Sequence, residues 1–245
     1  MIFRKAKIAA VSLAFVAACG AGYWQWWSNR APNFLPEDST TFVAQFAPPS
    51  PANSPQTRAE LDELLALQAA RTPAALAAAR ADRKKDIRQF YGALGVDAAM
   101  DSSLGPLRDF MERVETDVSV YVRAAKLRFA RSRPYVIESR LEPCTADVAD
   151  AQSYPSGHSS YGYVAALILA DMVPERRQAL LARADEFARQ RMVCGVHFAS
   201  DIAAGRVAAE WLVHELDQQA GFRSEKAETT AVLRAALKLP RAPPK

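Results

Sequence analysis

Long apolar runs are scarce in this sequence of 245 residues. Outside the first 27 residues the longest is YVAALILADMV, at 163–173, which is too short to span a bilayer and is interrupted by Asp171. This scarcity excludes a membrane protein with several spans. Gly/Ser linkers and repeats of 20 to 50 residues are likewise missing after the first fifty residues, so we expect a single domain.

The chain also has little net charge. The formal net charge is +4, and Arg4, Lys5 and Lys7 supply three of those charges, so 4 − 3 leaves +1 for the remainder. The other cations alternate with acidic residues, as in RADRKKDIRQ, which is typical of solvated helix faces. We therefore expect no nucleic-acid partner.

One apolar run stands at the N-terminus, directly after a cationic start. MIFRKAK followed by IAAVSLAFVAA matches a secretory signal, so we expect export to the periplasm. The residues VAAC at 16–19 resemble a bacterial lipobox in which Cys19 would carry the lipid, although Val stands where Leu is usual. Simple cleavage and an uncleaved anchor over 8–27, with tryptophans at its end, are the alternatives. Residues 1–27 are thus expected to be a signal or a membrane tether.

Cysteine is rare, with three residues in the chain. If Cys19 belongs to the lipid or the signal, Cys144 and Cys194 remain as a candidate pair in an oxidising compartment. The alternative is two separate buried thiols. Neither their spacing nor their neighbours resemble a zinc site, and we expect no metal.

Strand patterns are nearly absent, and the sequence after residue 56 predicts helices. Residues 28–56 are rich in Pro, Ser and Asn, and we expect an extended leader there without a packed core. Helical spacing and capping signals predict an all-α bundle of six to eight helices over 57–245. The expected helices are 57–71, 72–95 (closed by Gly95), 105–131, 157–171, 174–193, 200–219 and 224–238.

Two short segments carry groups that suit an anion. Lys126 ends a long predicted helix, and Arg133 follows it by seven residues, directly before a proline. Ser156, Gly157 and His158 precede an apolar helix, whose first-turn N–H groups and dipole favour negative charge. Taken singly, these segments also fit solvated helix-end charges and an ordinary N-cap turn.

A third segment contains Arg191, His197 and Asp201. The histidine and the aspartate are four residues apart, so in the first turn of a helix the carboxylate can accept a hydrogen bond from one ring nitrogen. A core histidine paired with a helix-capping Asp is the alternative. The chain has three histidines, and the remaining one, His214, is predicted to be an ordinary helix residue.

In combination, KxxxxxxRP, PSGH and RxxxxxHxxxD resemble the signature of the type 2 phosphatidic acid phosphatase superfamily, which includes vanadium haloperoxidases. The segments SYPSGHSSYGY and QRMVCGVHFASDIAAGRV are most similar to class A non-specific acid phosphatases of the bacterial periplasm. The resemblance implies an all-α, single-domain bundle of this type and a metal-independent acid phosphatase without a cofactor. Gln190 stands where the family usually has Ser before the arginine of the third motif.

The resemblance also implies roles for the motif residues. Phosphoryl transfer needs positioned positive groups around the phosphate oxygens. His197 would attack phosphorus, Asp201 would orient it, and His158 would protonate the leaving oxygen. A disulfide between Cys144 and Cys194 would fix the spacing of the two histidines. The expected phosphate ligands are Lys126, Arg133, Ser156, Gly157 and Arg191, with the N–H groups of Ser156 and Gly157 as donors.

The expected ligands are a phosphomonoester as substrate and phosphate or orthovanadate as inhibitor. Four alternatives stay open at this point: a vanadate-dependent peroxidase, a lipid-phosphate phosphatase, a non-catalytic phosphate-binding lipoprotein, and a hydrolase with His and Asp as metal ligands. The preferred phosphomonoester and whether the chain forms a homo-oligomer are also left open.

Overall fold

The computed structural model describes residues 30–145 and 152–240, so Cys19 and the predicted signal lie outside the described residues. Residues Pro32–Lys245 form one compact unit. Within the described part, the chain forms ten α-helices and three short 3₁₀ helices, and a single isolated bridge is its only β pairing. The predicted all-α class is confirmed.

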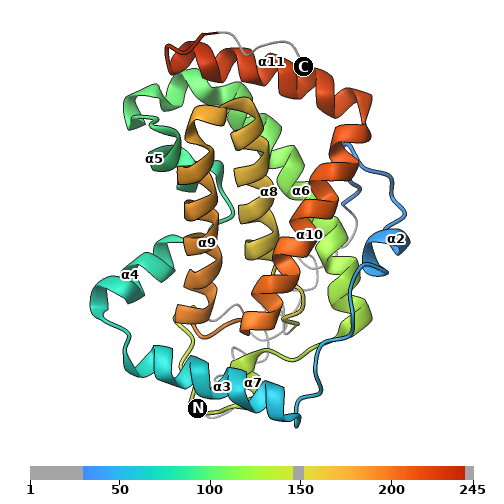
Figure 1. Ribbon diagram of the computed structural model, residues 1–245, viewed down its shortest axis with the longest axis vertical. Coiled ribbons are helices and arrows are strands. Elements are labelled where there is room, and N and C mark those ends of the chain that lie inside the picture. The colour runs from blue at the N-terminus through green and yellow to red at the C-terminus, as the bar shows by residue number, and fades with distance from the viewer. Residues whose placement is uncertain (1–29, 146–151, 241–245) are drawn as a thin grey trace, which may run out of the picture. The chain divides into compact units, whose positions relative to one another are not determined.

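The centre of the unit is the apolar helix α8 (Gly157–Met172), which packs between α9 (Arg177–Val193) and α10 (Ala199–Gln218). The long helix α6 (Gly105–Phe129) lies along the same group (Figure 1). Twelve of the sixteen residues of α8 are buried, which requires neighbours on nearly every side. Ser156 of the predicted PSGH segment is the N-cap of α8, and Gly157 and His158 are its first residues, so this helix fixes the position of the segment.

The other elements surround these four helices. In Figure 1, α11 lies across one end of the group and α3 near the other. The remaining helices are α2 (Thr40–Val43), α3 (Pro55–Ala69), α4 (Pro73–Ala81), η1 (Ile87–Phe90), α5 (Tyr91–Leu94), η2 (Ala98–Leu104), α7 (Pro134–Ile137), η3 (Pro174–Arg176) and α11 (Ala220–Ala236).

Most predicted helices are confirmed within a few residues, but the single helix predicted over 72–95 is wrong. It begins with the expected cap, since the Thr72 hydroxyl accepts a hydrogen bond from Ala75 N–H. The helix then ends at Ala81, and the Asp86 side chain caps a new turn by accepting from Arg88 N–H. A second N-cap inside an otherwise helical pattern stops the first helix.

The leader contributes to the core, so the expectation that no core packs there is also wrong. Leu35, Phe42 and Phe46 are buried, and Phe42 packs edge-on against Tyr121 of α6. The buried carboxylate of Asp117 accepts hydrogen bonds from three successive leader N–H groups, those of residues 33–35. A buried carboxylate needs such donors, and the backbone of the leader supplies them.

No helix within the described ranges has the length and apolar character needed to cross a membrane.

Candidate active site

The first two motifs are joined by a short antiparallel contact. Helix α6 ends at Phe129, and Ala130, with a φ of 47°, turns the chain. The next residues run beside the segment before PSGH. Ser153 N–H donates to the Arg131 carbonyl at 2.8 Å, and Ser132 forms a bridge with Gln152. The Lys126 ammonium donates to the Gln152 carbonyl from the end of α6. The cations of the first motif are therefore held against the start of the second.

The PSGH segment forms the N-terminus of α8, as predicted, but one donor is used differently. The Ser156 hydroxyl caps the helix by accepting from Ser159 N–H at 3.3 Å. The Ser156 N–H donates to the backbone carbonyl of Asp201 at 3.0 Å, so the prediction that this N–H faces a phosphate is wrong. The N–H groups of Gly157 and His158 lie in the first turn, where a helix has no acceptor of its own.

Helix α10 approaches this turn very closely, and Gly205 makes the approach feasible. A Cβ at Gly205 would lie 2.6 Å from Ser159 Cβ and 2.9 Å from the Ser156 carbonyl oxygen. The Ser159 hydroxyl donates to the Ile202 carbonyl at 2.8 Å across the same contact. Because Gly205 has no side chain, the second motif can pack directly against α10, the helix that begins in the third motif.

The third motif forms the first turn of α10, and its histidine has a defined hydrogen-bonding pattern. One oxygen of Asp201, Oδ2, lies 3.2 Å from His197 Nδ1 and accepts from Phe198 N–H at 2.9 Å. On the other side of the ring, Nε2 lies 3.0 Å from Arg133 Nη1, which is always a donor. The ring therefore carries its proton on Nδ1 and presents the Nε2 lone pair to Arg133.

The ring of His197 is 1% exposed and surrounded by cations. Burial holds the pKa of His197 well below its usual value, and the charge of Arg133 lowers it further. Lys126 and Arg191 act in the same direction, while a backbone hydrogen bond with Ser153 opposes them. The three predicted cations thus converge on one imidazole, which stays neutral at physiological pH.

His158 lies in the first turn of α8, with its Nε2 2.7 Å from the Arg83 carbonyl. Part of its surface is open, but dense surroundings lower the pKa of His158 well below its usual value. Positive charge on Arg191, and then on Lys85, lowers the pKa further, and the Arg83 hydrogen bond opposes this. His197 also acts on this pKa, so the two histidines share one electrostatic environment.

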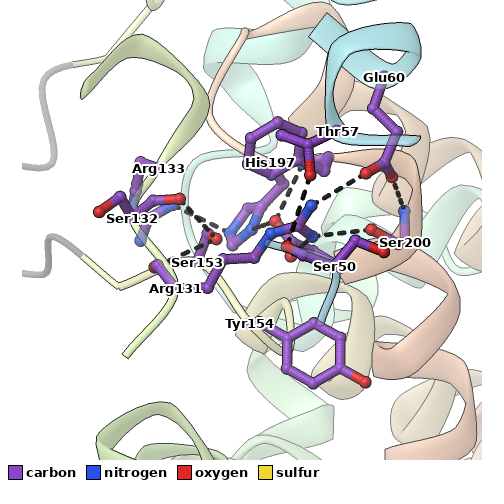
Figure 2. A network of polar contacts seen from close by, with 12 residues as sticks. Ser50, Thr57, Glu60, Arg131, Ser132, Arg133, Ser153, Tyr154, His197 and Ser200 are labelled. Atoms are coloured by element: carbon purple, nitrogen blue, oxygen red, sulfur yellow. Dashed lines mark hydrogen bonds and ion pairs between the residues drawn. The ribbon is translucent and has the colours of Figure 1, made fainter. Parts of the chain in front are cut away.

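The structure adds two charged residues that the sequence analysis missed. Arg131 donates from Nη1 to Asp201 Oδ1 at 2.7 Å. From Nη2 it donates to Glu60 of α3 at 2.9 Å (Figure 2). Arg131 lies inside the KxxxxxxRP segment, two residues before Arg133. In an extended chain, residues two apart point to the same side, so the sequence could have indicated that Arg131 lies near the site. Nothing in the sequence around Glu60 distinguishes it from other helix-surface glutamates.

Gln190 stands where the family usually has Ser, and its side-chain nitrogen does not contact Arg191. Its amide donates to Glu186, one helical turn earlier on α9. Gln190 is 5% exposed and Arg191 is fully buried. The Gln side chain therefore packs into the helix interface.

The predicted disulfide between Cys144 and Cys194 is present in the structure. The two cysteines are also joined by a backbone hydrogen bond of 2.9 Å from Cys144 N–H to the Cys194 carbonyl. Gly195 follows with a φ of 71°, a left-handed conformation that favours glycine, and the chain then enters the third motif. The disulfide thus holds the segment before His197.

Within ranges 30–145 and 152–240, no group of three or more His, Cys, Asp or Glu side chains could hold a metal ion.

Comparison with known proteins agrees with this geometry. Residues 117–218, which contain all three motifs, match the model of the PAP2 superfamily. This match confirms, for that part of the chain, the resemblance given by the motifs.

Curated relatives are bacterial acid phosphatases. The chain is 31% identical over 115 residues to a non-specific acid phosphatase of Providencia stuartii, covering 46% of each chain. It is 42% identical over 86 residues to one of Salmonella typhimurium, covering 34% of each chain. An acid phosphatase of Zymomonas mobilis is 36% identical over 120 residues, which is 44% of this chain and 45% of the relative. The matched regions therefore span less than half of the relatives' length.

The contact at Gly205 generates a test of how the site is assembled. We expect Gly205→Ala to lower the free energy of unfolding by about 1–3 kcal/mol, because the added methyl must displace Ser159 or the Ser156 carbonyl. Orthovanadate affinity should fall with it, as measured by calorimetry. Gly221→Ala is the matched control, since a Cβ there meets nothing within 4 Å. Equal stability and vanadate affinity in both variants would contradict the proposed role of the contact.

Proposed function

We propose that this protein hydrolyses phosphate monoesters at acidic pH through a covalent phosphohistidine. The observation that carries the proposal is the arrangement at His197, whose Nδ1 lies 3.2 Å from Asp201 and whose Nε2 lies 3.0 Å from a buried arginine. The imidazole is thus a neutral nucleophile with a cation beside its reactive nitrogen. Attack on an anionic phosphate requires both, because the cation attracts the phosphate oxygens. The acid phosphatase relatives support the same reaction.

The first step is attack of His197 Nε2 on phosphorus. A new N–P bond forms while the P–O bond to the leaving group breaks, and the leaving oxygen takes a proton from His158. In the structure, Arg133 donates to Nε2. A bound phosphate would accept this hydrogen bond instead and would also be attracted by the charges of Lys126 and Arg191. These side chains can stabilise the equatorial oxygens in the transition state.

In the second step, water attacks the phosphohistidine. His158 takes a proton from that water, the N–P bond breaks, and inorganic phosphate leaves with His197 restored. The Arg83 carbonyl accepts a hydrogen bond from His158 Nε2, which leaves Nδ1 as the nitrogen that exchanges the proton. A dianionic substrate opposes the positive charges around His158 and so favours its protonated form.

We further propose that the chain is exported. The cationic and apolar N-terminal pattern supports this, although it lies outside the described residues. A disulfide persists in oxidising compartments, so the Cys144–Cys194 bond is consistent with the same location. Fractionation of a bacterial host should recover the activity outside the cytoplasm. Labelling with a fatty acid that depends on Cys19 would identify the lipid-bearing form, and recovery in the cytoplasm alone would reject export.

Replacing the nucleophile should remove the reaction. We expect His197→Ala to lower the turnover of p-nitrophenyl phosphate by more than the ~10²- to 10³-fold loss that follows removal of one electrostatic donor. Phosphoenzyme formation, followed with ³²P-labelled substrate in acid-quenched samples, should vanish as well. His214→Ala, which changes an exposed histidine on α10, is the control and should turn over normally. Normal hydrolysis by His197→Ala would rule out the phosphohistidine.

The pH profile should report the lowered pKa of His158. This histidine must be protonated to release the leaving group, so kcat/KM should fall as pH rises through its pKa in the free enzyme. The pKa is lowered, so the decline belongs on the acid side of pH 6.5. Lys85→Gln removes one of the charges that lower the pKa, and its alkaline limb should move to higher pH.

The substrate ionises identically in both assays, so the difference between the two profiles isolates the enzyme. Lys84→Gln, next to Lys85 but exposed, is the matched control and should follow the unmodified profile. An unmoved limb in Lys85→Gln, or activity that still rises at pH 9, would contradict the assignment of His158 as the acid.

A further inference from the structure

Three charged side chains are buried beside the proposed nucleophile. Those of Arg131 and Glu60 are 5% and 10% exposed, and that of Asp201 is fully buried. A buried charge is costly unless it is paired and hydrogen-bonded. The proposed reaction uses only Asp201 directly, which leaves the arginine and the glutamate without an assigned role.

The guanidinium of Arg131 is fixed by several contacts. Nη1 donates to Asp201 Oδ1 at 2.7 Å. Nη1 also donates to the Ser200 hydroxyl at 2.7 Å, and Nη2 donates to Glu60 Oε2 at 2.9 Å (Figure 2). The other oxygen of Glu60 accepts from Ser200 N–H at 2.7 Å. The guanidinium carbon lies 3.9 Å from the centre of the Phe198 ring.

This arrangement connects α3 to the first turn of α10. Glu60 contacts both Arg131 and the backbone of Ser200, while Arg131 reaches the carboxylate oxygen of Asp201 that His197 does not use. Each oxygen of Asp201 therefore has its own donors, and the carboxylate cannot rotate without breaking one set. The orientation of the His197 ring depends on that carboxylate.

We propose that Arg131, held by Glu60, is a positioning residue that fixes Asp201 and thereby keeps His197 in the form protonated on Nδ1. In its catalytic consequences this rests on the proposed function. Burial raises the pKa of Asp201 and Arg131 opposes that rise, so the same contact that aims the carboxylate also favours its ionised form. An ionised Asp201 accepts a hydrogen bond from the Nδ1–H group, so that Nε2 carries no proton.

The test is Arg131→Gln, with a readout that does not depend on catalysis. In ¹H and ¹⁵N NMR spectra of the ring-labelled protein, His197 should show a proton on Nδ1 and a bare Nε2. In Arg131→Gln the downfield Nδ1 proton should weaken or shift and the two tautomers should mix. In the Ser-His-Asp hydrolases, holding the histidine in the wrong tautomer with the geometry intact costs about 10⁴-fold in kcat. Because Asp201 itself remains, we expect a smaller loss here, about 10²-fold in kcat, with KM changed by less than about threefold.

Two variants separate the contacts. Glu60→Gln keeps an oxygen for Ser200 N–H but loses the ionic acceptor for Arg131, and it should give a smaller loss in the same direction. Because Glu60 acts through Arg131, the double variant Glu60→Gln/Arg131→Gln should match Arg131→Gln alone. Arg131→Lys keeps the charge and should restore part of the turnover.

Arg234→Gln is the matched control, because Arg234 is also a buried arginine paired with a glutamate. It is 4% exposed, contacts Glu175 at 2.8 Å, and donates to the Met172 carbonyl at the far end of α8, about 24 Å from the PSGH segment. It should lower the thermal stability without changing the His197 NMR signals or kcat.

The outcomes distinguish this proposal from the proposed function. An unchanged His197 tautomer in Arg131→Gln and Glu60→Gln, or the same loss in Arg234→Gln, would overturn the positioning role. If Arg131→Gln does not fold, Arg131→Lys and Glu60→Gln decide the matter by the same spectra. If the unmodified protein hydrolyses no phosphomonoester while the His197 signals respond as expected, the proposed function fails and the positioning role stands.

Discussion

The buried carboxylate of Asp201 is the group on which the site depends. This carboxylate accepts hydrogen bonds from Arg131 and Phe198 N–H and lies next to His197 Nδ1. The backbone carbonyl of the same residue accepts a hydrogen bond from Ser156 N–H. One residue thus joins all three sequence motifs and the start of α10. Removing such a charge from water is costly, and the cost is offset only when each oxygen has a donor. The segment after α6 supplies Arg131 for one oxygen, Phe198 N–H donates to the other, and Glu60 of α3 holds Arg131 in place.

The close packing of α8 and α10 follows from the same constraint. Ser156 can donate to the Asp201 carbonyl only if the two helix N-termini are adjacent, and Gly205 removes the side chain that would prevent this. The interface between α8 and α9 contains a similar contact, where a Cβ at Gly162 would lie 2.8 Å from the Phe187 ring. Gly162 on α8 and Gly205 on α10 therefore set the distances from α8 to its neighbours α9 and α10.

Local signals explain what the sequence predicted well. The apolar helix after PSGH, the capped helix at 55–69 and the third motif each carry their own periodicity or cap, and the structure places them within a few residues. The His197–Asp201 contact needed only a four-residue spacing. The break in the helix predicted over 72–95 is a local cap at Asp86, and the other errors came from long-range partners. Asp117 attracts the leader across 82 residues of chain, and Glu60 pairs with Arg131 across 71, which no local pattern can specify.

The two histidines have lowered pKa values for the same physical reasons, which are dense surroundings and nearby cations. Their proposed tasks differ, because His197 must be neutral to attack and His158 must be protonated to release the leaving oxygen. The partners of Nε2 differ: Arg133 donates a hydrogen bond to Nε2 of His197, whereas Nε2 of His158 donates to the Arg83 carbonyl. A bound dianion would counter the cations around both rings. The carbonyl bond favours the protonated form of His158, so substrate binding should couple to proton uptake there.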